Sequence, residues 1–206
     1  MTAVSARPKA FAAGRSTYSA VAIALHWLIA ILILTNIGLA WYFDDLKGPA
    51  KVAPLALHKS IGITVLLLSL IRIGWRLANP PPPLPAHMRP WERWIAKATH
   101  LVFYVLMLGL PLSGWAMVSA SPLIKTHPTV LYGVVPWPAL PFPGVDGDQL
   151  HAARKLFSLT HETLAKVAYA AIVLHVVGAL KHIVIDRDDV VARMIPLLGR
   201  GRGARP

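Results

Sequence analysis

Four long apolar blocks, separated by shorter polar segments, dominate this sequence. They cover roughly residues 18–42, 55–77, 94–118 and 159–184. Each block exceeds the ~20 residues that an α-helix needs to cross the hydrocarbon core of a bilayer. Because a backbone polar group cannot stay unsatisfied in lipid, each block must be helical. The sequence therefore predicts an all-α fold, a transmembrane four-helix bundle.

The composition agrees with an integral membrane protein. Of the 206 residues, 55% are hydrophobic and only 15% are charged, whereas about 25% of the residues in a soluble domain are charged. The chain has no cysteine, which excludes thiolate-ligated haem, haem attached through a C-x-x-C-H motif and iron–sulfur clusters held by cysteine. The first apolar block is longer than a signal-peptide core and no cleavage site follows it, so we expect no secretory signal.

The net charge of +12 is unevenly distributed. Basic residues concentrate in the first 17 residues, between the second and third blocks, and after the fourth block. Four spans place these three segments on one side of the membrane, and the positive-inside rule predicts that this side is the cytoplasm. The pattern argues against nucleic-acid binding. We therefore expect a cytoplasmic N-terminal tail (1–17), a four-span domain (18–186) and a basic cytoplasmic C-terminal tail (187–206).

Proline marks the ends of two spans. The run 79–85 contains five prolines and closes the second span on the predicted cytoplasmic side. Residues 119–148 are rich in proline and glycine and form the longest external segment. We expect this segment to be a cap on the membrane surface, and the fourth helix to begin near Asp148, before the bilayer.

Histidine is the residue type that points to a function. Six of the nine histidines lie in the apolar blocks or at their ends. His161 and His175 are fourteen residues apart, close to four helical turns, so they share one face at a separation of about 21 Å. With the N-terminus inside, His58 matches His161 in depth and His26 matches His175. Ionisable groups inside a bilayer are costly and indicate a functional site.

Depth in the membrane does not by itself decide which histidines form the pairs. His182 is seven residues past His175 on nearly the same face, and His100 begins the third block. Either could replace His175 or His26 in a pairing. Zinc is a poor candidate, because it usually takes four ligands and the apolar parts of the spans contain no acidic residue, with only Glu162 adjacent to one. Two facing imidazoles suit a six-coordinate haem iron, which then transfers electrons and has no free position for oxygen.

Haem propionates need cations close to the membrane faces. Arg72 and Arg76 stand four residues apart, on one face, at the inner end of the second block. Lys59 follows His58 at the outer end. We predict that these three residues bind the cofactors, although Arg76 could instead be an interfacial residue that reaches the aqueous phase.

Four stretches, taken in order, resemble the bacterial cytochrome b561 family. They are 18–27 (YSAVAIALHW), 58–62 (HKSIG) followed by 72–76 (RIGWR), 100–115 with its PLSGW, and 161–194. The resemblance implies a four-helix bundle with two b-type haems ligated from the first, second and fourth spans. It assigns His26 and His175 to the inner haem, and His58 and His161 to the outer haem, which favours His175 over His182.

The resemblance also implies an activity. Members of the family are similar to multi-pass inner-membrane electron carriers linked to the quinone pool, and one type oxidises superoxide outside and reduces ubiquinone. We therefore expect an oxidoreductase that transfers electrons from superoxide to ubiquinone. A basic outer mouth would attract the superoxide anion; its candidate residues are Lys51, Lys59, Lys125, Lys155 and Lys166.

Two other functions stay open. The first is a b-type anchor subunit that exchanges electrons with a partner dehydrogenase or hydrogenase. The second is a histidine-lined transporter for metal or protons, which would be colourless after purification.

Overall fold

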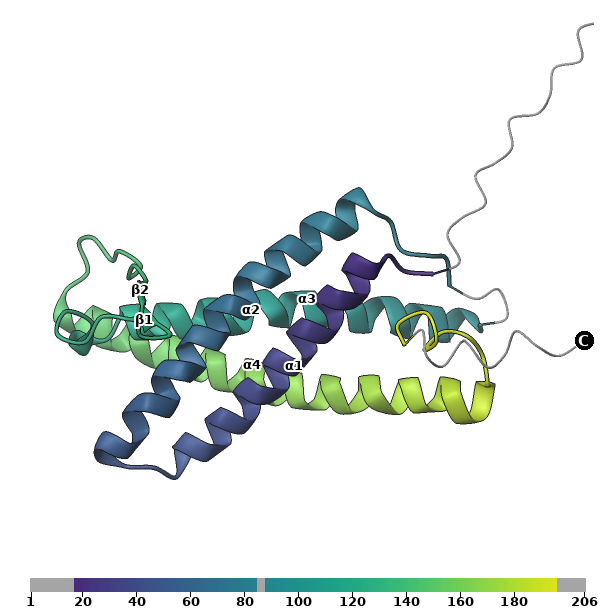
Figure 1. Ribbon diagram of the computed structural model, residues 1–206. Helices are drawn as coiled ribbons and strands as arrows, with labels where there is room; N and C mark the ends of the chain where they lie inside the picture. Colours follow the sequence, from purple (N-terminus) through teal and green to yellow (C-terminus); the bar gives the residue numbers. More distant parts are fainter. Residues whose placement is uncertain (1–16, 85–87, 196–206) are drawn as a thin grey trace, which may run out of the picture.

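The computed structural model describes residues 17–84 and 88–195, and four long helices make up most of this part (Figure 1). They are α1 (Ala20–Asp44), α2 (Val52–Ala78), α3 (Pro90–Ser119) and α4 (Gly147–Lys181). All four are long and apolar enough to cross a membrane. The predicted all-α class and the four spans are confirmed.

Shorter elements connect or extend these helices. A 3-10 turn (Gly48–Lys51) leads into α2, and a second one (Pro122–Ile124) follows α3. The strands β1 (Val130–Leu131) and β2 (Val135–Pro136) form a small antiparallel hairpin. One π-helical turn (His182–Asp186) extends α4.

Local chemistry sets the helix boundaries. Ser19 caps α1 by accepting a hydrogen bond from Ala22 N at 3.2 Å, and Asp146 caps α4 by accepting one from Gln149 N at 2.8 Å. Pro90 is the first residue of α3, where its missing N–H costs nothing. The early start of α4 agrees with the prediction that this helix begins before the bilayer.

The helices pack in chain order. α1 packs on α2, α2 on α3 and α3 on α4, whereas α1 and α4 are not among the closely packed pairs in the described part. One buried cluster joins the first three helices through Ile29, Ile61 and Met107, and another joins α3 to α4 through Leu106 and Ala168. Side chains on the outward faces are apolar and exposed, as lipid requires.

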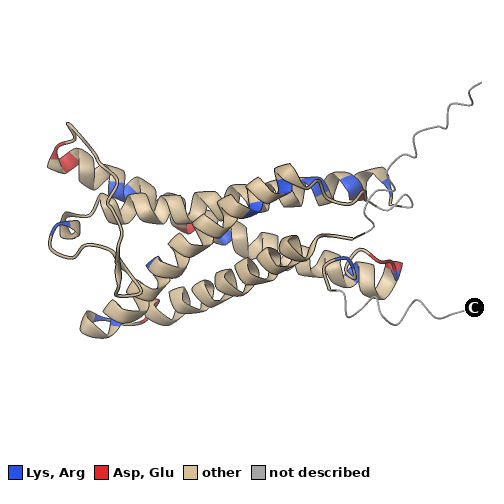
Figure 2. Cartoon of the chain, turned by 45° about the horizontal axis from the view of Figure 1, so that its top comes forward, with Lys and Arg blue, Asp and Glu red and all other residues tan. Residues whose placement is uncertain are grey.

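Both ends of the described chain lie at the same end of the bundle (Figure 1). We call this the inner end; it also holds the connection between α2 and α3. The outer end holds the α1–α2 turn and the segment between α3 and α4. Charged residues lie mainly toward these two ends (Figure 2), and α1 carries none before Asp44. That the inner end faces the cytoplasm stays a prediction.

The outer segment 121–146 packs on α2 and α3. Tyr132 N donates to Ser60 Oγ at 2.9 Å, and the Tyr132 hydroxyl lies 2.7 Å from Thr64 Oγ1. Trp115 Nε1 donates to Pro138 O at 2.9 Å. Tyr132 and Gly133 both have positive φ, as the tight turn between β1 and β2 requires. These contacts tie the segment to the helix ends.

Candidate functional site

Two pairs of histidines face each other at different depths of the bundle. At the inner level, His26 of α1 faces His175 of α4, with ring centroids 6.3 Å apart and an interplanar angle of 67°. At the outer level, His58 of α2 faces His161 of α4, again with centroids 6.3 Å apart and an angle of 77°. The structure thus brings together the residues that depth matching paired. Their role as ligands stays a prediction.

The spacing within each pair fits one metal ion between the rings. Metal–imidazole bonds of about 2 Å on each side, plus the distance from each nitrogen to its ring centre, put two opposed imidazole ligands about 6 Å apart between centroids. Both pairs lie at this separation. Two opposed axial ligands are what a haem iron accepts, because the porphyrin fills the other four positions.

Hydrogen bonds fix the orientation of the outer pair. His58 Nδ1 lies 3.1 Å from the carbonyl oxygen of Asn36, and His161 Nδ1 lies 2.9 Å from that of Leu110. Since a carbonyl can only accept, each Nδ1 must carry the proton, and Nε2 keeps its lone pair for a metal. Sequence reasoning missed both carbonyls, because a backbone acceptor leaves no signal in residue identity.

The PLSGW stretch lies directly against His161. Ser113 Oγ is 3.1 Å from His161 Nδ1 and donates to Leu110 O at 2.9 Å. A Cβ at Gly114 would come within 3.2 Å of His161 Cε1, so a side chain there would crowd the ring. Trp115 of the same stretch holds the outer segment. The motif therefore has a local physical reason to accompany His161.

Aromatic rings enclose both pairs. The ring of Phe103 lies 5.3 Å from that of His175, and the ring of Phe43 lies 5.2 Å from that of His58. Trp27 follows His26 and contacts it edge-on at 5.4 Å. These rings limit the movement of the imidazoles and keep their surroundings apolar.

The predicted arginines lie beside the inner pair. Arg72 Nη1 donates to Ala22 O at 2.9 Å, one helical turn before His26, and Arg72 interacts electrostatically with His26. The guanidinium carbon of Arg76 lies 5.6 Å from the ring centre of Tyr104. Both arginines line one small cavity at the inner end. Lys59, next to His58, is half-buried and has no ion pair in residues 17–84 or 88–195.

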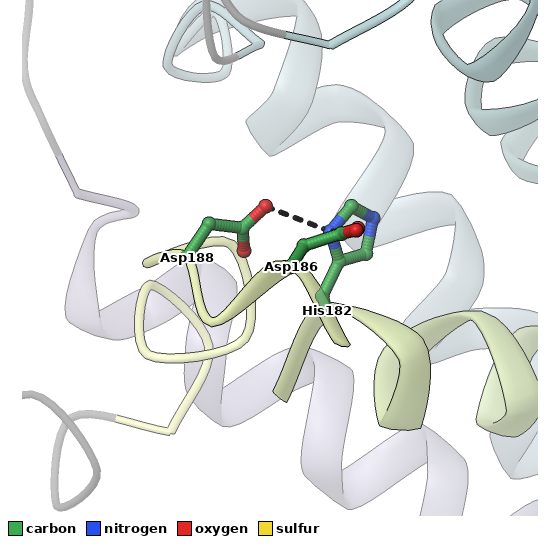
Figure 3. Close-up of side chains that lie close together, drawn as sticks. All are labelled: His182, Asp186 and Asp188. Atoms are coloured by element: carbon green, nitrogen blue, oxygen red, sulfur yellow. Dashed lines mark hydrogen bonds and ion pairs between the residues drawn. The ribbon is translucent and has the colours of Figure 1, made fainter. Parts of the chain in front are cut away.

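His182, which depth alone left open, has other partners. Its Nδ1 lies 2.8 Å from Asp188 Oδ2 and 3.1 Å from Asp186 Oδ2 (Figure 3). Lys181 Nζ in turn contacts Asp186 at 2.6 Å and Glu92 at 3.0 Å. This network ties the start of α3 to the end of α4. His175, and not His182, faces His26.

A basic cavity of about 210 Å³ opens at the outer end. It is lined by Met117 of α3 and by a face of α4 that carries His151, Arg154, Lys155 and Ser158. Ser158 precedes His161 by three residues on the same helix, so the cavity lies one to three turns outward of the outer pair. Of the lysines predicted for an outer mouth, Lys155 lines this cavity. Lys51 instead lies 5.5 Å from the ring of Phe43.

The sequence was compared with models of known protein families. Residues 17–197, which include all four paired histidines, match the sequence model described as prokaryotic cytochrome b561. The chain belongs to the prokaryotic cytochrome b561 family. It is therefore a multi-pass bacterial membrane protein and a b-type cytochrome that takes part in electron transfer. The family expected from the four stretches is confirmed.

Three curated relatives cover most of the chain. The protein is 35% identical over 183 residues to "Cytochrome b561 homolog 2" of Escherichia coli (strain K12), across 86% of this chain and 90% of the relative. It is 29% identical over 189 residues to "Probable superoxide oxidase CybB" of Yersinia pestis, across 87% of this chain and 96% of the relative. A third, "Cytochrome b561 homolog 1" of Escherichia coli (strain K12), is 26% identical over 185 residues, across 87% of this chain and 97% of the relative.

Proposed function

We propose that this cytochrome b561 carries two b-type haems and transfers electrons from superoxide, at the outer face of the bacterial inner membrane, to ubiquinone. The observation that carries the proposal is the pair of equal 6.3 Å imidazole separations, stacked at two depths along one face of α4. His26 and His175 would hold the inner haem, and His58 and His161 the outer haem. Both chain termini would then lie in the cytoplasm.

The chain's own residues prepare each site for its haem. A bound haem would supply one-electron redox chemistry, and each pair of histidines would hold one haem. The carbonyls of Asn36 and Leu110 keep the protons of His58 and His161 on Nδ1. Arg72 and Arg76 at the inner site, and Lys59 at the outer site, would bind propionates.

The basic outer cavity is evidence in favour of an anionic electron donor. Arg154 and Lys155 have no ion-pair partner among the described residues, and both line the cavity outward of His161. Positive charge at such a mouth raises the rate at which a small anion arrives. Two superoxide ions would give two molecules of O₂ and two electrons, which together with two protons convert a quinone to its quinol. The relative named as a probable superoxide oxidase supports the same donor.

A test with the purified protein and no partner addresses the donor directly. Superoxide should reduce the haem anaerobically, and added ubiquinone should reoxidise it, whereas superoxide dismutase should abolish the reduction. Arg154→Gln with Lys155→Gln should slow reduction by about tenfold at low ionic strength and by less at high salt, because screening weakens long-range attraction. Lys97→Gln at the inner end is the matched control.

Two outcomes would contradict the proposal. One is a haem protein that quinol reduces but superoxide does not. The other is a superoxide reaction whose rate depends neither on the salt concentration nor on the two substitutions. Co-purification of a larger redox subunit, with no superoxide reaction, would instead indicate the anchor-subunit function.

A further inference from the structure

Four side chains form a compact polar cluster beside the inner histidine pair. α2 contributes Arg72 and Arg76, which are four residues apart, and α3 contributes His100 and Tyr104, which have the same spacing. Residues four apart lie on one face of a helix. Two matching faces of neighbouring helices therefore meet here, at the depth of the inner pair.

Tyr104 contacts both guanidinium groups. It lines the same small cavity as Arg72, with which it interacts electrostatically, and its ring lies under Arg76, with the guanidinium carbon 5.6 Å from the ring centre. Arg72 is also held from the other side, where its Nη1 donates to Ala22 O at 2.9 Å. Each arginine is thus fixed by contacts that leave some of its five N–H donors unused.

The cluster has positive charge and no matching negative charge. Within residues 17–84 and 88–195, no Asp or Glu pairs with Arg72 or Arg76, and the nearby His26, His100 and His175 supply none. A partly buried cation in a membrane span is costly unless an anion accompanies it. The cluster therefore has the charge and the hydrogen-bond donors to bind an anion.

His100, one helical turn before Tyr104 on α3, is the fourth member of the cluster. It interacts electrostatically with Arg72, Arg76 and His175, and with the backbone of Ala96 one helical turn earlier. An imidazole N–H can also donate a hydrogen bond to an acidic group. A carboxylate between this ring and the two guanidiniums would satisfy all three side chains, since Arg binds carboxylates with two parallel hydrogen bonds.

We propose that Arg72, Arg76 and His100 bind the propionate carboxylates of the haem held between His26 and His175, and that Tyr104 positions the two guanidiniums. This inference rests on the proposed function and adds His100 and Tyr104 to it. Two guanidiniums match the two carboxylates that a b-type haem carries. The phosphate of a lipid headgroup is the other anion that could reach the inner end, and the test below separates the two.

Redox titration of the purified protein gives the first readout. Loss of a cation beside the propionates disfavours the reduced haem. Arg72→Gln and Arg76→Gln should each lower the midpoint potential of the inner haem by at least about 59 mV, which corresponds to a tenfold change in a one-electron redox equilibrium. His100→Gln and Tyr104→Phe should produce smaller decreases. Arg72→Lys should stay near the wild-type value, and the outer haem serves as the internal control.

Infrared difference spectra give a second measurement, which should not change if His100 and Tyr104 have only a structural role. Haem labelled with ¹³C at its propionate carboxyls identifies their bands in the reduced-minus-oxidised spectrum. These bands should shift in His100→Gln and Tyr104→Phe, both of which should keep two haems, and should not shift in Lys97→Gln.

Unchanged bands and unchanged potentials in all four cluster variants would overturn the inference while leaving the proposed function intact. Potentials that respond to removal of anionic lipid, with unchanged carboxylate bands, would assign the cluster to a phosphate instead. A wild-type protein without an inner haem would refute the proposed function itself.

Discussion

Replacing either histidine of the outer pair should remove one of two haems and leave the other in place. In His58→Ala and His161→Ala the opposing imidazole has no partner, so a haem at the outer site would be held by one histidine instead of two. The inner pair lies about 21 Å away along α4 and should be unaffected. The measurement is haem per chain by pyridine haemochrome, with the low-spin optical bands of the haem that remains.

The two outer histidines differ in the hydrogen-bond partners that each substitution removes, but the expected haem content is the same. His161 carries two neighbours, Leu110 O and Ser113 Oγ, that would lose their partner in His161→Ala. His58 has Asn36 O. Both variants should drop from two haems to one, and His127→Ala, outside both pairs, should keep two. Retention of both haems in either outer variant would show that the assignment is wrong.

At the inner level the decisive comparison is between His175→Ala and His182→Ala. His175 faces His26 at 6.3 Å between ring centroids, whereas His182 contacts Asp186 and Asp188. We expect His175→Ala to lose the inner haem and His182→Ala to retain it, as shown by haem content and by the number of steps in a redox titration. The reverse result would exchange the roles of these two histidines.

The apolar pattern was sufficient to predict the membrane fold. Each of the four blocks became a helix, because lipid leaves no other arrangement for so long an apolar stretch. The early start of α4 was also predictable, since Asp146 and Asp148 provide a helix start ahead of the apolar part.

The choice among the inner histidines was not predictable from depth. His175 and His182 lie on nearly the same face of a regular α-helix, so periodicity cannot separate them. The structure separates them by their partners, because His175 faces the ring of His26, whereas the π-helical turn that begins at His182 brings Asp186 and Asp188 back onto His182. A π-helical turn has no reliable sequence signal.

Contacts between residues far apart in the chain could not be predicted from the sequence either. Ser60 and Tyr132 are 72 residues apart, and their hydrogen bond depends on how the proline-rich outer segment folds back. Strands of two residues, such as β1 and β2, are too short to show alternation. Tyr104 had a weak signal, since it lies four residues after His100 on α3, but its contact with both arginines required the packing of α2 on α3.

The measurement that tests the central claim most directly is the haem content of the unmodified protein, purified in detergent and titrated against potential. Four imidazoles in two pairs predict two low-spin haems per chain and two one-electron steps. A single haem, or a protein without haem, would contradict the account.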